Sequence, residues 1–179
     1  PGKPGTPINP GQGSASYPDG TDKAGLTDTV NRTITYQMSD GSKAPAAVHD
    51  QLSYTATKVI DKVTGAVIKT DWSENQNFKD VTSPNMTGYT ADKQVVSNQN
   101  VAHDAKDINV VVTYTADDQK ATVKYIDDTT GKILDTKPLS GKTNAKSGYT
   151  TANDIQTYEN LGYTLVSDST NGAEIVFDN

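Results

Sequence analysis

Hydrophobic and polar residues alternate along several stretches of the chain, which is the pattern of strands with one buried face. The first stretch covers residues 30–38 and the second covers residues 52–60, with an Asp-Gly turn at positions 40 and 41 between them. The third stretch, residues 108–114, is the most apolar, and Val111 indicates that its second face is partly covered as well. The alternation therefore predicts a fold built mainly of strands.

One hairpin pattern occurs twice. The segment Lys58–Ile68 returns as Lys124–Leu134, and in both copies β-branched and aromatic residues flank an Asp-x-x-Thr-Gly turn. The glycine of this turn can take the positive φ angle that tight turns require. Each copy is followed by Gly-Tyr-Thr, at residues 88–90 and 148–150. Proteins built from tandem copies of a small β unit act by presenting surface or length more often than by forming one deep catalytic pocket.

The second half of the chain also contains a helical pattern. Thr151 with Asp154 is typical of a capping pair, and Gly162 stands where glycine ends a helix. Two further strands are expected at residues 163–166 and 174–177, around an Asn-Gly turn. The apolar stripe of the helix consists of Ile155, Tyr158 and Leu161.

These elements divide the chain into three parts. Residues 1–26 hold most of the prolines and predict a linker or an ordered strap. Residues 27–116 form a first, longer module, in which the polar stretch 75–84 gives no clear period and a short helix is one alternative. Residues 117–179 form a second, shorter module. Because a sheet crossed by one helix is the β-grasp arrangement, we expect a mainly β fold with minor α (α+β): two tandem β-grasp (ubiquitin-like) modules in an elongated arrangement.

Composition narrows the range of partners. The formal net charge is −6 and Arg32 is the only arginine, so nucleic acid and anionic lipid surfaces would be repelled. No apolar run approaches the length of about 18 residues that a membrane-spanning helix needs, so we expect no membrane insertion. The absence of cysteine excludes disulfides, thiolate zinc sites and thiol nucleophiles.

No motif indicates catalysis. Residues 140–143 (Ser-Gly-Lys-Thr) end like a phosphate-binding loop, but Thr136 stands where that loop needs a glycine, so a polar turn between strands is the better interpretation. We interpret the aspartates at 127–128 as turn caps, because neighbouring side chains diverge and the spacing of a calcium loop is absent. The only histidines, His49 and His103, lie outside any catalytic triplet and are expected in solvated loops. We therefore predict no enzymatic activity, no metal site and no cofactor.

Exposed aromatic residues are the natural candidates for sugar binding, because sugars lay their apolar faces on rings while their hydroxyls meet polar groups. A structural role competes with this one, since a tyrosine that follows glycine in both copies could anchor a loop to the sheet. The glycan-binding candidates are Trp72, Tyr89, Tyr149 and Tyr163. Three other tyrosines alternate with the core face and are expected to pack inward: Tyr36, Tyr114 and Tyr125.

The chain resembles the mucus-binding (Mub) repeats of surface adhesins from lactic acid bacteria. The residues that look like their C-terminal MucBP module are Val123–Leu134, Gly148–Thr150 and Asn160–Val166. Those that look like the longer preceding module are Arg32–Tyr36, Asp40-Gly41, Asp61–Gly65, Trp72, Val81–Pro84, Gly88–Thr90 and Val110–Tyr114. Together these motifs span residues 27–179 and leave the leading strap outside the match.

The resemblance implies a repeat unit of an extracellular, cell-wall-anchored adhesin, with adjacent repeats of the same chain as its neighbours. Its partners would be mucin glycoproteins, bound through their glycans, and immunoglobulins are a further candidate. The segments that target and anchor such a protein are expected outside these residues. The alternative function is a structural spacer that projects a distal adhesive tip from the cell wall. The resemblance supplies no motif-defined sugar site, so the four aromatic candidates depend on the argument from ring chemistry alone.

Overall fold

The computed structural model describes residues 1–178. The described chain divides into two compact units. Unit 1 comprises Pro1–Gln37, Lys43–Pro84 and Lys93–Thr113. Unit 2 comprises Met38–Ser42, Asn85–Asp92 and the chain from Tyr114 onward.

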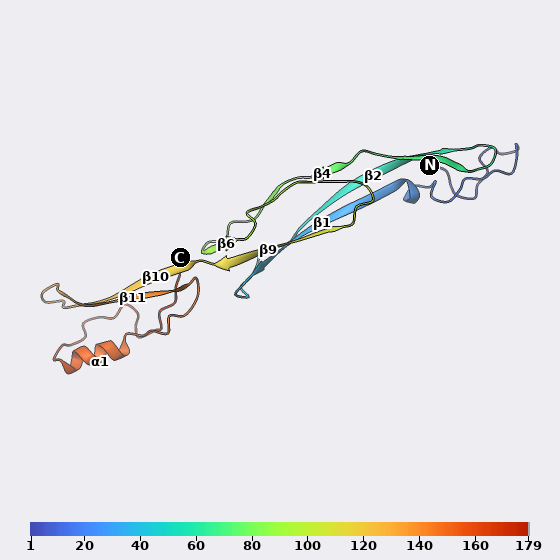
Figure 1. Ribbon diagram of the computed structural model, residues 1–179. Coiled ribbons are helices and arrows are strands. Elements are labelled where there is room, and N and C mark those ends of the chain that lie inside the picture. The colour runs from blue at the N-terminus through green and yellow to red at the C-terminus, as the bar shows by residue number, and fades with distance from the viewer. Residues whose placement is uncertain (179) are drawn as a thin grey trace. The chain divides into compact units, whose positions relative to one another are not determined.

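Strands dominate the described chain (Figure 1). The strands are β1 (Thr27–Met38), β2 (Val48–Ile60), β3 (Val67–Trp72), β4 (Gln76–Phe78), β5 (Val81–Thr82), β6 (Tyr89–Ala91), β7 (Val95–Val96), β8 (Gln99–Val101), β9 (Ile108–Ala116), β10 (Asp118–Ile126) and β11 (Ile133–Lys142). The helices are a 3-10 turn, η1 (Ala24–Leu26), and α1 (Ala152–Asn160). The predicted class, mainly β with minor α, is confirmed.

One five-stranded sheet has the order β3-β2-β1-β9-β6. Strands β1, β2 and β3 form an antiparallel meander, and β6 pairs antiparallel with the end of β9. Two-stranded ladders join β4 to β8, β5 to β7 and β10 to β11. The short helix considered for residues 75–84 does not form, because the only fully buried apolar side chain of this stretch is Phe78, too little for an amphipathic helix.

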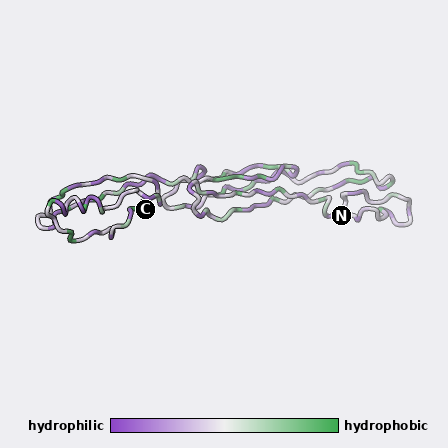
Figure 2. The backbone as a smooth tube through the Cα atoms, turned by 90° about the horizontal axis from the view of Figure 1, so that it is seen from below, coloured by the Kyte–Doolittle hydropathy of each residue, from purple (hydrophilic) through white to green (hydrophobic). Residues whose placement is uncertain are grey.

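The core of unit 1 follows the predicted alternation. Along β1, Val30 and Ile34 are fully buried, and Tyr36 is buried as expected. Figure 2 shows hydrophobic and hydrophilic residues alternating along the paired strands. The prediction that the second face of β9 is partly covered is wrong at Val111, which is 47% exposed. A single apolar side chain on a solvated strand face is common in soluble proteins and costs little.

The leading segment, residues 1–26, folds back on itself within unit 1 and is called the strap from here on. The N–H of Gly5 donates to the carbonyl of Tyr17 (2.9 Å), and that of Ile8 donates to the carbonyl of Ala15 (3.0 Å). An isolated bridge joins Pro7 and Ser16. Backbone hydrogen bonds therefore give the strap an ordered path despite its proline content.

The sequence duplication is also a duplication of local structure. In both hairpins the register shifts at the same place, after Val59 in the first copy and after Tyr125 in the second. The N–H of the turn glycine donates to the carbonyl of the turn aspartate in each copy, at 2.8 Å for Gly65 and 2.7 Å for Gly131. The two turns therefore share one backbone conformation.

The turn aspartates cap their own turns. The carboxylate of Asp61 accepts the N–H of Val63 at 2.7 Å, and that of Asp127 accepts the N–H of Thr129 at 3.0 Å. Backbone donors lower the pKa of Asp61, and the Thr130 hydroxyl, followed by backbone donors, lowers that of Asp127. The interpretation as a turn cap is confirmed for Asp127, and Asp61 caps the turn of the first copy in the same way.

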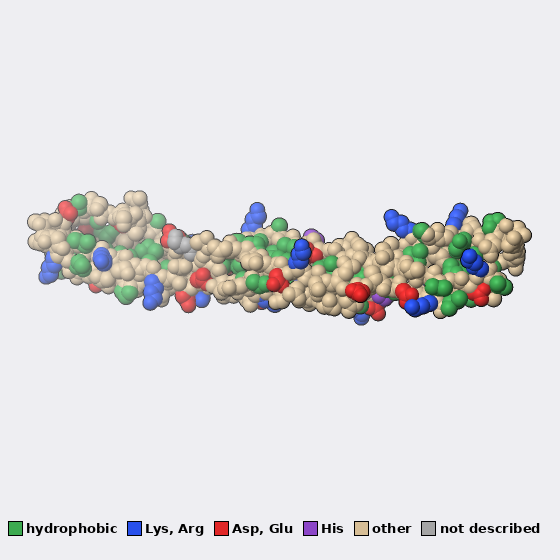
Figure 3. All heavy atoms as spheres, turned by 90° about the horizontal axis from the view of Figure 1, so that it is seen from above, with side chains coloured by type: hydrophobic (Ala, Val, Ile, Leu, Met, Phe, Trp, Pro, Cys, Tyr) green, Lys and Arg blue, Asp and Glu red, His purple; other side chains and the backbone are tan. Residues whose placement is uncertain are grey.

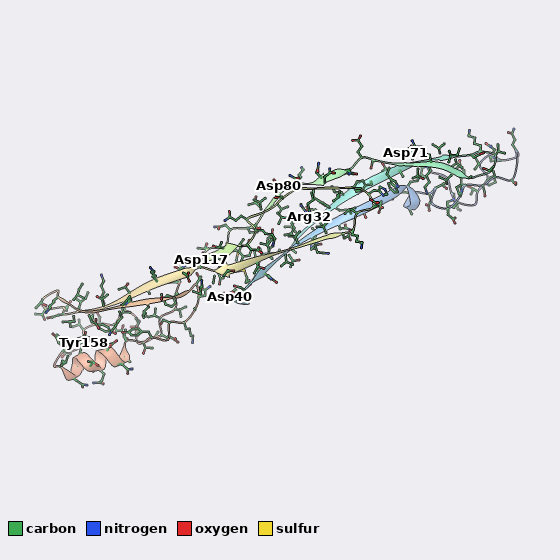
Figure 4. All side chains as sticks on the ribbon, viewed as in Figure 1. Arg32, Asp40, Asp71, Asp80, Asp117 and Tyr158 are labelled. Atoms are coloured by element: carbon green, nitrogen blue, oxygen red, sulfur yellow. The ribbon has the colours of Figure 1, made fainter. Side chains whose placement is uncertain are left out.

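Helix α1 lies against the β10–β11 hairpin in unit 2 (Figure 1), and Tyr158 extends from it towards the hairpin (Figure 4). It ends as predicted, because Gly162 takes a φ of 95° and its N–H donates to Glu159, while the N–H of Tyr163 donates to Tyr158. These two bonds are the Schellman motif. Within residues 1–178, neither helix is long and apolar enough to cross a membrane.

The start of α1 differs from the prediction. Thr151 has helical backbone angles and its side chain makes no capping bond. Its hydroxyl donates instead to the carboxylate of Asp168 at 2.7 Å, and Asp154 accepts hydrogen bonds from tyrosine hydroxyls. The predicted capping pair is wrong because tertiary partners take both side chains.

The last predicted strands form only in part. Residues 163–166 are not a strand and lie exposed, and Leu161, the third member of the predicted stripe, is 70% exposed. Among the described residues these side chains have no sheet to cover them. Residues 175–177 do run beside residues 144–149, through an isolated bridge from Lys146 to Val176 and flanking backbone hydrogen bonds.

Residues 140–143 are not the turn that the sequence suggested. Their first three members end β11, and the chain turns only afterwards. Gly141 lies directly beneath the ring of Phe177, so close that a Cβ there would be 2.3 Å from a ring carbon. The glycine is therefore explained by packing within the core of unit 2.

Candidate ligand-binding site

Unit 2 contains a hollow of about 410 Å³ whose walls include several polar side chains. Figure 4 shows Asp40, one of its residues, on the turn after β1, and Asp117 between β9 and β10. The residues around the hollow, called the polar hollow from here on, are Ser39, Asp40, Ser42, Thr115, Ala116, Lys142, Thr143, Asn144 and Ala145.

The first wall is the turn that follows β1. Gly41 has a φ of 78°, which glycine adopts without strain, and the N–H of Ser42 donates to the Asp40 carboxylate at 2.9 Å. The N–H of Ser39 donates to the carbonyl of Tyr114 at 2.9 Å, which fixes the turn against β9. The Asp-Gly pair that the sequence marked as a turn therefore also places a carboxylate and two hydroxyls at the hollow.

Tyr89 joins the walls of the hollow. Its hydroxyl donates to the Asp40 carboxylate at 2.7 Å and accepts from the side-chain amide of Asn144 at 3.0 Å. The hydroxyl of Ser42 lies 3.3 Å from the same oxygen. Of the predicted candidates, Tyr89 is thus the one bonded to residues of the hollow, with its hydroxyl engaged as an anchor and its ring half-buried.

Asn144 holds an uncommon backbone conformation. Its φ of 64° lies in the left-handed region, and its N–H donates to the carbonyl of Phe177 at 2.6 Å. Non-glycine residues in this region are found disproportionately at functional sites. The sequence reasoning missed Asn144, and the only signal was a polar Lys-Thr-Asn run at the end of a strand.

The charges at the hollow are mixed. Backbone and side-chain donors, the N–H of Ser42 first and the Tyr89 hydroxyl next, lower the pKa of Asp40, so its carboxylate stays ionised at neutral pH. Lys142 pairs with Asp118 at 2.7 Å, and both side chains are exposed. In the part of the chain that the structure describes, no group of three or more His, Cys, Asp or Glu side chains could hold a metal ion. The walls offer hydroxyls, an amide, a carboxylate and an ammonium group, which suit the hydroxyls of a sugar.

Trp72 belongs to unit 1 and does not join the polar hollow. It is half-buried and packs on the core cluster of Val30, Tyr54 and Phe78. Its ring stacks on that of His103, with centroids 4.2 Å apart and planes 10° from parallel.

The expectation that both histidines lie in solvated loops is wrong. The His103 side chain is 27% exposed beneath the stacked indole. His49 is exposed but lies in β2, where its Nδ1 is 3.2 Å from the Thr33 hydroxyl. Aromatic stacking and cross-strand pairing hold the two rings, and neither interaction is visible in the sequence.

Tyr149 and Tyr163, the other two candidates, belong to one cluster of four tyrosines in unit 2. The Tyr149 hydroxyl donates to Asp154 and lies 2.6 Å from the hydroxyl of Tyr125. The Tyr158 ring lies 5.3 Å from that of Tyr125 and 5.9 Å from that of Tyr163. Burial, followed by the hydrogen bond to Asp154, raises the pKa of Tyr149. Tyr149 is thus tied down by its hydroxyl, and Tyr163, at 42% exposure, presents the more accessible ring.

Two family models match the chain, one after the other. A model of the Muc B2-like domain matches residues 21–118, and a model of the mucin binding domain matches residues 119–179. No curated protein matches the chain.

Solved structures with similar sequences are also mucin-binding or mucus-binding domains. Mub-RV is 30% identical, with a TM-score of 0.50, over 55% of this chain and 58% of its own. A mucin-binding domain from Streptococcus pneumoniae is 28% identical over 50% of this chain and 91% of its own, with a TM-score of 0.46. The type 2 repeat of the mucus binding protein MUB from Lactobacillus reuteri is 35% identical over 51% of this chain and 50% of its own, with a TM-score of 0.43. The chain belongs to the Muc B2-like domain family, with a mucin binding domain following, and its resemblance to mucus-binding repeats is confirmed.

Proposed function

We propose that the chain binds mucin glycans through the polar hollow and acts as one repeat of an extracellular adhesin. The observation that carries this proposal is the arrangement of Asp40, Ser42 and Asn144 around the Tyr89 hydroxyl, at the edge of a concave surface. Sugars are bound by such sets of hydroxyl, amide and carboxylate groups beside a ring. The proposal rests on this geometry and on the family to which the chain belongs.

Binding by a single repeat should be weak. The hollow supplies a handful of hydrogen-bonding groups, and the net charge of −6 gives no long-range attraction to the sialate and sulfate groups of mucins. We expect a dissociation constant between about 1 mM and tens of micromolar for one repeat. Many repeats acting together would multiply this affinity without any new contact.

Binding should depend little on salt. Charged side chains are scattered singly over the face shown in Figure 3, without one extended basic patch. Since salt screens long-range attraction but hardly affects short hydrogen bonds, mucin retention should change less than about twofold between 50 and 300 mM NaCl. Retention on mucin-coated plates measures this, and a steep decline over that range would contradict capture by short-range contacts.

The hollow can be tested with Asn144→Gly. Glycine accepts the φ of 64° at this position without strain, so folding should be preserved while the side-chain amide at the hollow is lost. We expect mucin-glycan binding to weaken by about fivefold, the effect of one lost hydrogen bond with its partner left unpaired. NMR titration of the chain with mucin-type oligosaccharides measures the change.

A matched control is Asn171→Gly, the same substitution at the other asparagine of positive φ, which lies outside the hollow. It should bind as the unchanged chain does. Equal binding by the two variants would move the site away from the hollow, and the exposed ring of Tyr163 would be the next candidate to substitute.

The alternative function is a spacer that carries a distal adhesive tip away from the cell wall. The spacer function predicts that the purified chain retains no mucin at all, and the measurement on mucin-coated plates decides this.

Immunoglobulins are a second partner class in the proposal. Retention of the chain on plates coated with immunoglobulin tests this binding.

A further inference from the structure

The strap docks on the first of the two duplicated turns. The Nζ of Lys58 donates to the carbonyl of Gly20 at 2.7 Å. The backbone of Ser16 passes directly over Gly65, where a Cβ would lie 2.8 Å from the Ser16 carbonyl oxygen. Gly65 is buried by this contact. Gly65 therefore serves two purposes: it adopts the φ of 79° that the turn needs, and its lack of a side chain lets the strap approach.

The second turn has the same geometry without a strap. Gly131 has a φ of 72°, and a Cβ there would meet no atom within 4 Å. Lys124, at the position that Lys58 has in the first copy, is exposed, and its side chain makes no hydrogen bond or ion pair within residues 1–178. Ile126 is 55% exposed, whereas its counterpart Ile60 is half-buried. The second copy thus keeps the cation and the glycine that hold the strap but leaves both uncovered.

We propose that the second turn, formed by Lys124, Ile126 and Gly131, binds the strap of a second copy of this chain by exchange. The strap would leave its own first turn, pass its Ser16 backbone over Gly131 and accept the Lys124 ammonium group at its Gly20 carbonyl. Each repeat then carries one strap and two turns that can receive it. Such an exchange links copies head to tail at low cost, because the lysine–carbonyl hydrogen bond and the close approach over the turn glycine, both lost at the first turn, can form again at the second.

Charge permits the exchange. The strap holds two lysines and two aspartates, so it is neutral against a chain of net charge −6. The strap's own turn is favoured by its tether, which corresponds to an effective concentration of the order of millimolar. Exchange between free copies is therefore weak, and it strengthens where copies are held close together.

Blocking the first turn should release the strap to the second. In Gly65→Asn the turn is kept, because asparagine tolerates a positive φ, but the added side chain occupies the path of Ser16. This variant should self-associate at concentrations near about 1 mM, where the unchanged chain is monomeric. Adding Gly131→Asn should abolish the association, and Gly131→Asn alone should leave a monomer. Sedimentation equilibrium measures all four chains, and association that survives the second substitution would refute the proposal.

A second measurement does not depend on the folding of Gly65→Asn. A synthetic peptide of residues 1–23 is titrated into the isotope-labelled, unchanged chain, and saturable NMR shifts are expected at the amides of residues 124–133. Lys124→Ala should weaken this binding by about fivefold, as loss of a charge-assisted hydrogen bond predicts. Lys120→Ala, an exposed lysine on the same face of β10, is the control and should bind normally. An absence of shifts at residues 124–133 would overturn the proposal.

Discussion

Arg32→Leu should lower the free energy of unfolding of unit 1 by about 3 kcal/mol, because it removes one partner of a buried ion pair. The guanidinium donates to Asp50 through Nε (3.1 Å) and Nη2 (2.8 Å), and Nη2 also donates to the carbonyl of Lys79 (2.7 Å). It also stacks on Phe78, 4.8 Å from the ring centroid. We expect the lower end of the usual destabilisation for a broken buried ion pair. The Asp50 side chain is 34% exposed, so water can partly solvate its carboxylate once the arginine is removed.

Urea denaturation followed by the fluorescence of Trp72 measures this loss, since the only tryptophan packs on the same core. Lys69→Leu is the control, because it breaks an exposed pair with Asp71 and should change stability by less than about 0.5 kcal/mol. Replacing Arg32 and Asp50 together with leucine should restore part of the loss. If Arg32→Leu were as stable as the control, the buried pair would have no structural role.

Phe177→Ala should destabilise unit 2 by about 3–5 kcal/mol, the usual cost of removing a buried aromatic side chain. Phe177 is 3% exposed, and its ring covers Gly141 of β11. Its carbonyl also accepts the N–H of Asn144, so a wall of the polar hollow depends on it. We therefore expect glycan binding to weaken together with stability.

Hydrogen exchange at the amides of β11 reports on this substitution, because Trp72 belongs to the other unit. Phe177→Leu should cost less than about 1.5 kcal/mol, since it preserves most of the buried volume. Gly141→Ala should cost about 1–3 kcal/mol by forcing a methyl group onto the ring. Unchanged exchange in Phe177→Ala would show that this ring does not hold the unit together.

Predictions from local patterns succeeded where local geometry decides the structure. Alternation placed Val30, Ile34 and Tyr36 in the core because strand side chains point to opposite faces in turn. The turn aspartates and the glycine that ends α1 act within a few residues of themselves, so their roles were readable without a fold. Phe177 and Gly141 show the opposite case, because their contact joins segments that no local pattern connects.

The candidate site likewise combines a residue that the sequence could mark with contacts that only the fold creates. The sequence marked Tyr89 as an aromatic candidate, but its hydroxyl meets Asp40 and Asn144, which lie far from it along the chain. No sequence pattern marks Asn144 as a site residue, because its importance comes from its positive φ angle and from the residues that its side chain contacts. Trp72 was an equally natural candidate by composition, and only its stacking on His103 shows that the ring is already occupied in packing.

By itself the sequence determined the duplicated hairpin and the mainly β class, because repeated motifs, alternation and turn residues are properties of neighbouring positions. Its resemblance to mucus-binding repeats indicated the family. The tertiary structure alone decided that three distant segments enclose the polar hollow and that the strap covers one of two equivalent turns. Which side chains share a surface depends on long-range packing, and two turns with the same local sequence differ only in what the rest of the chain places against them.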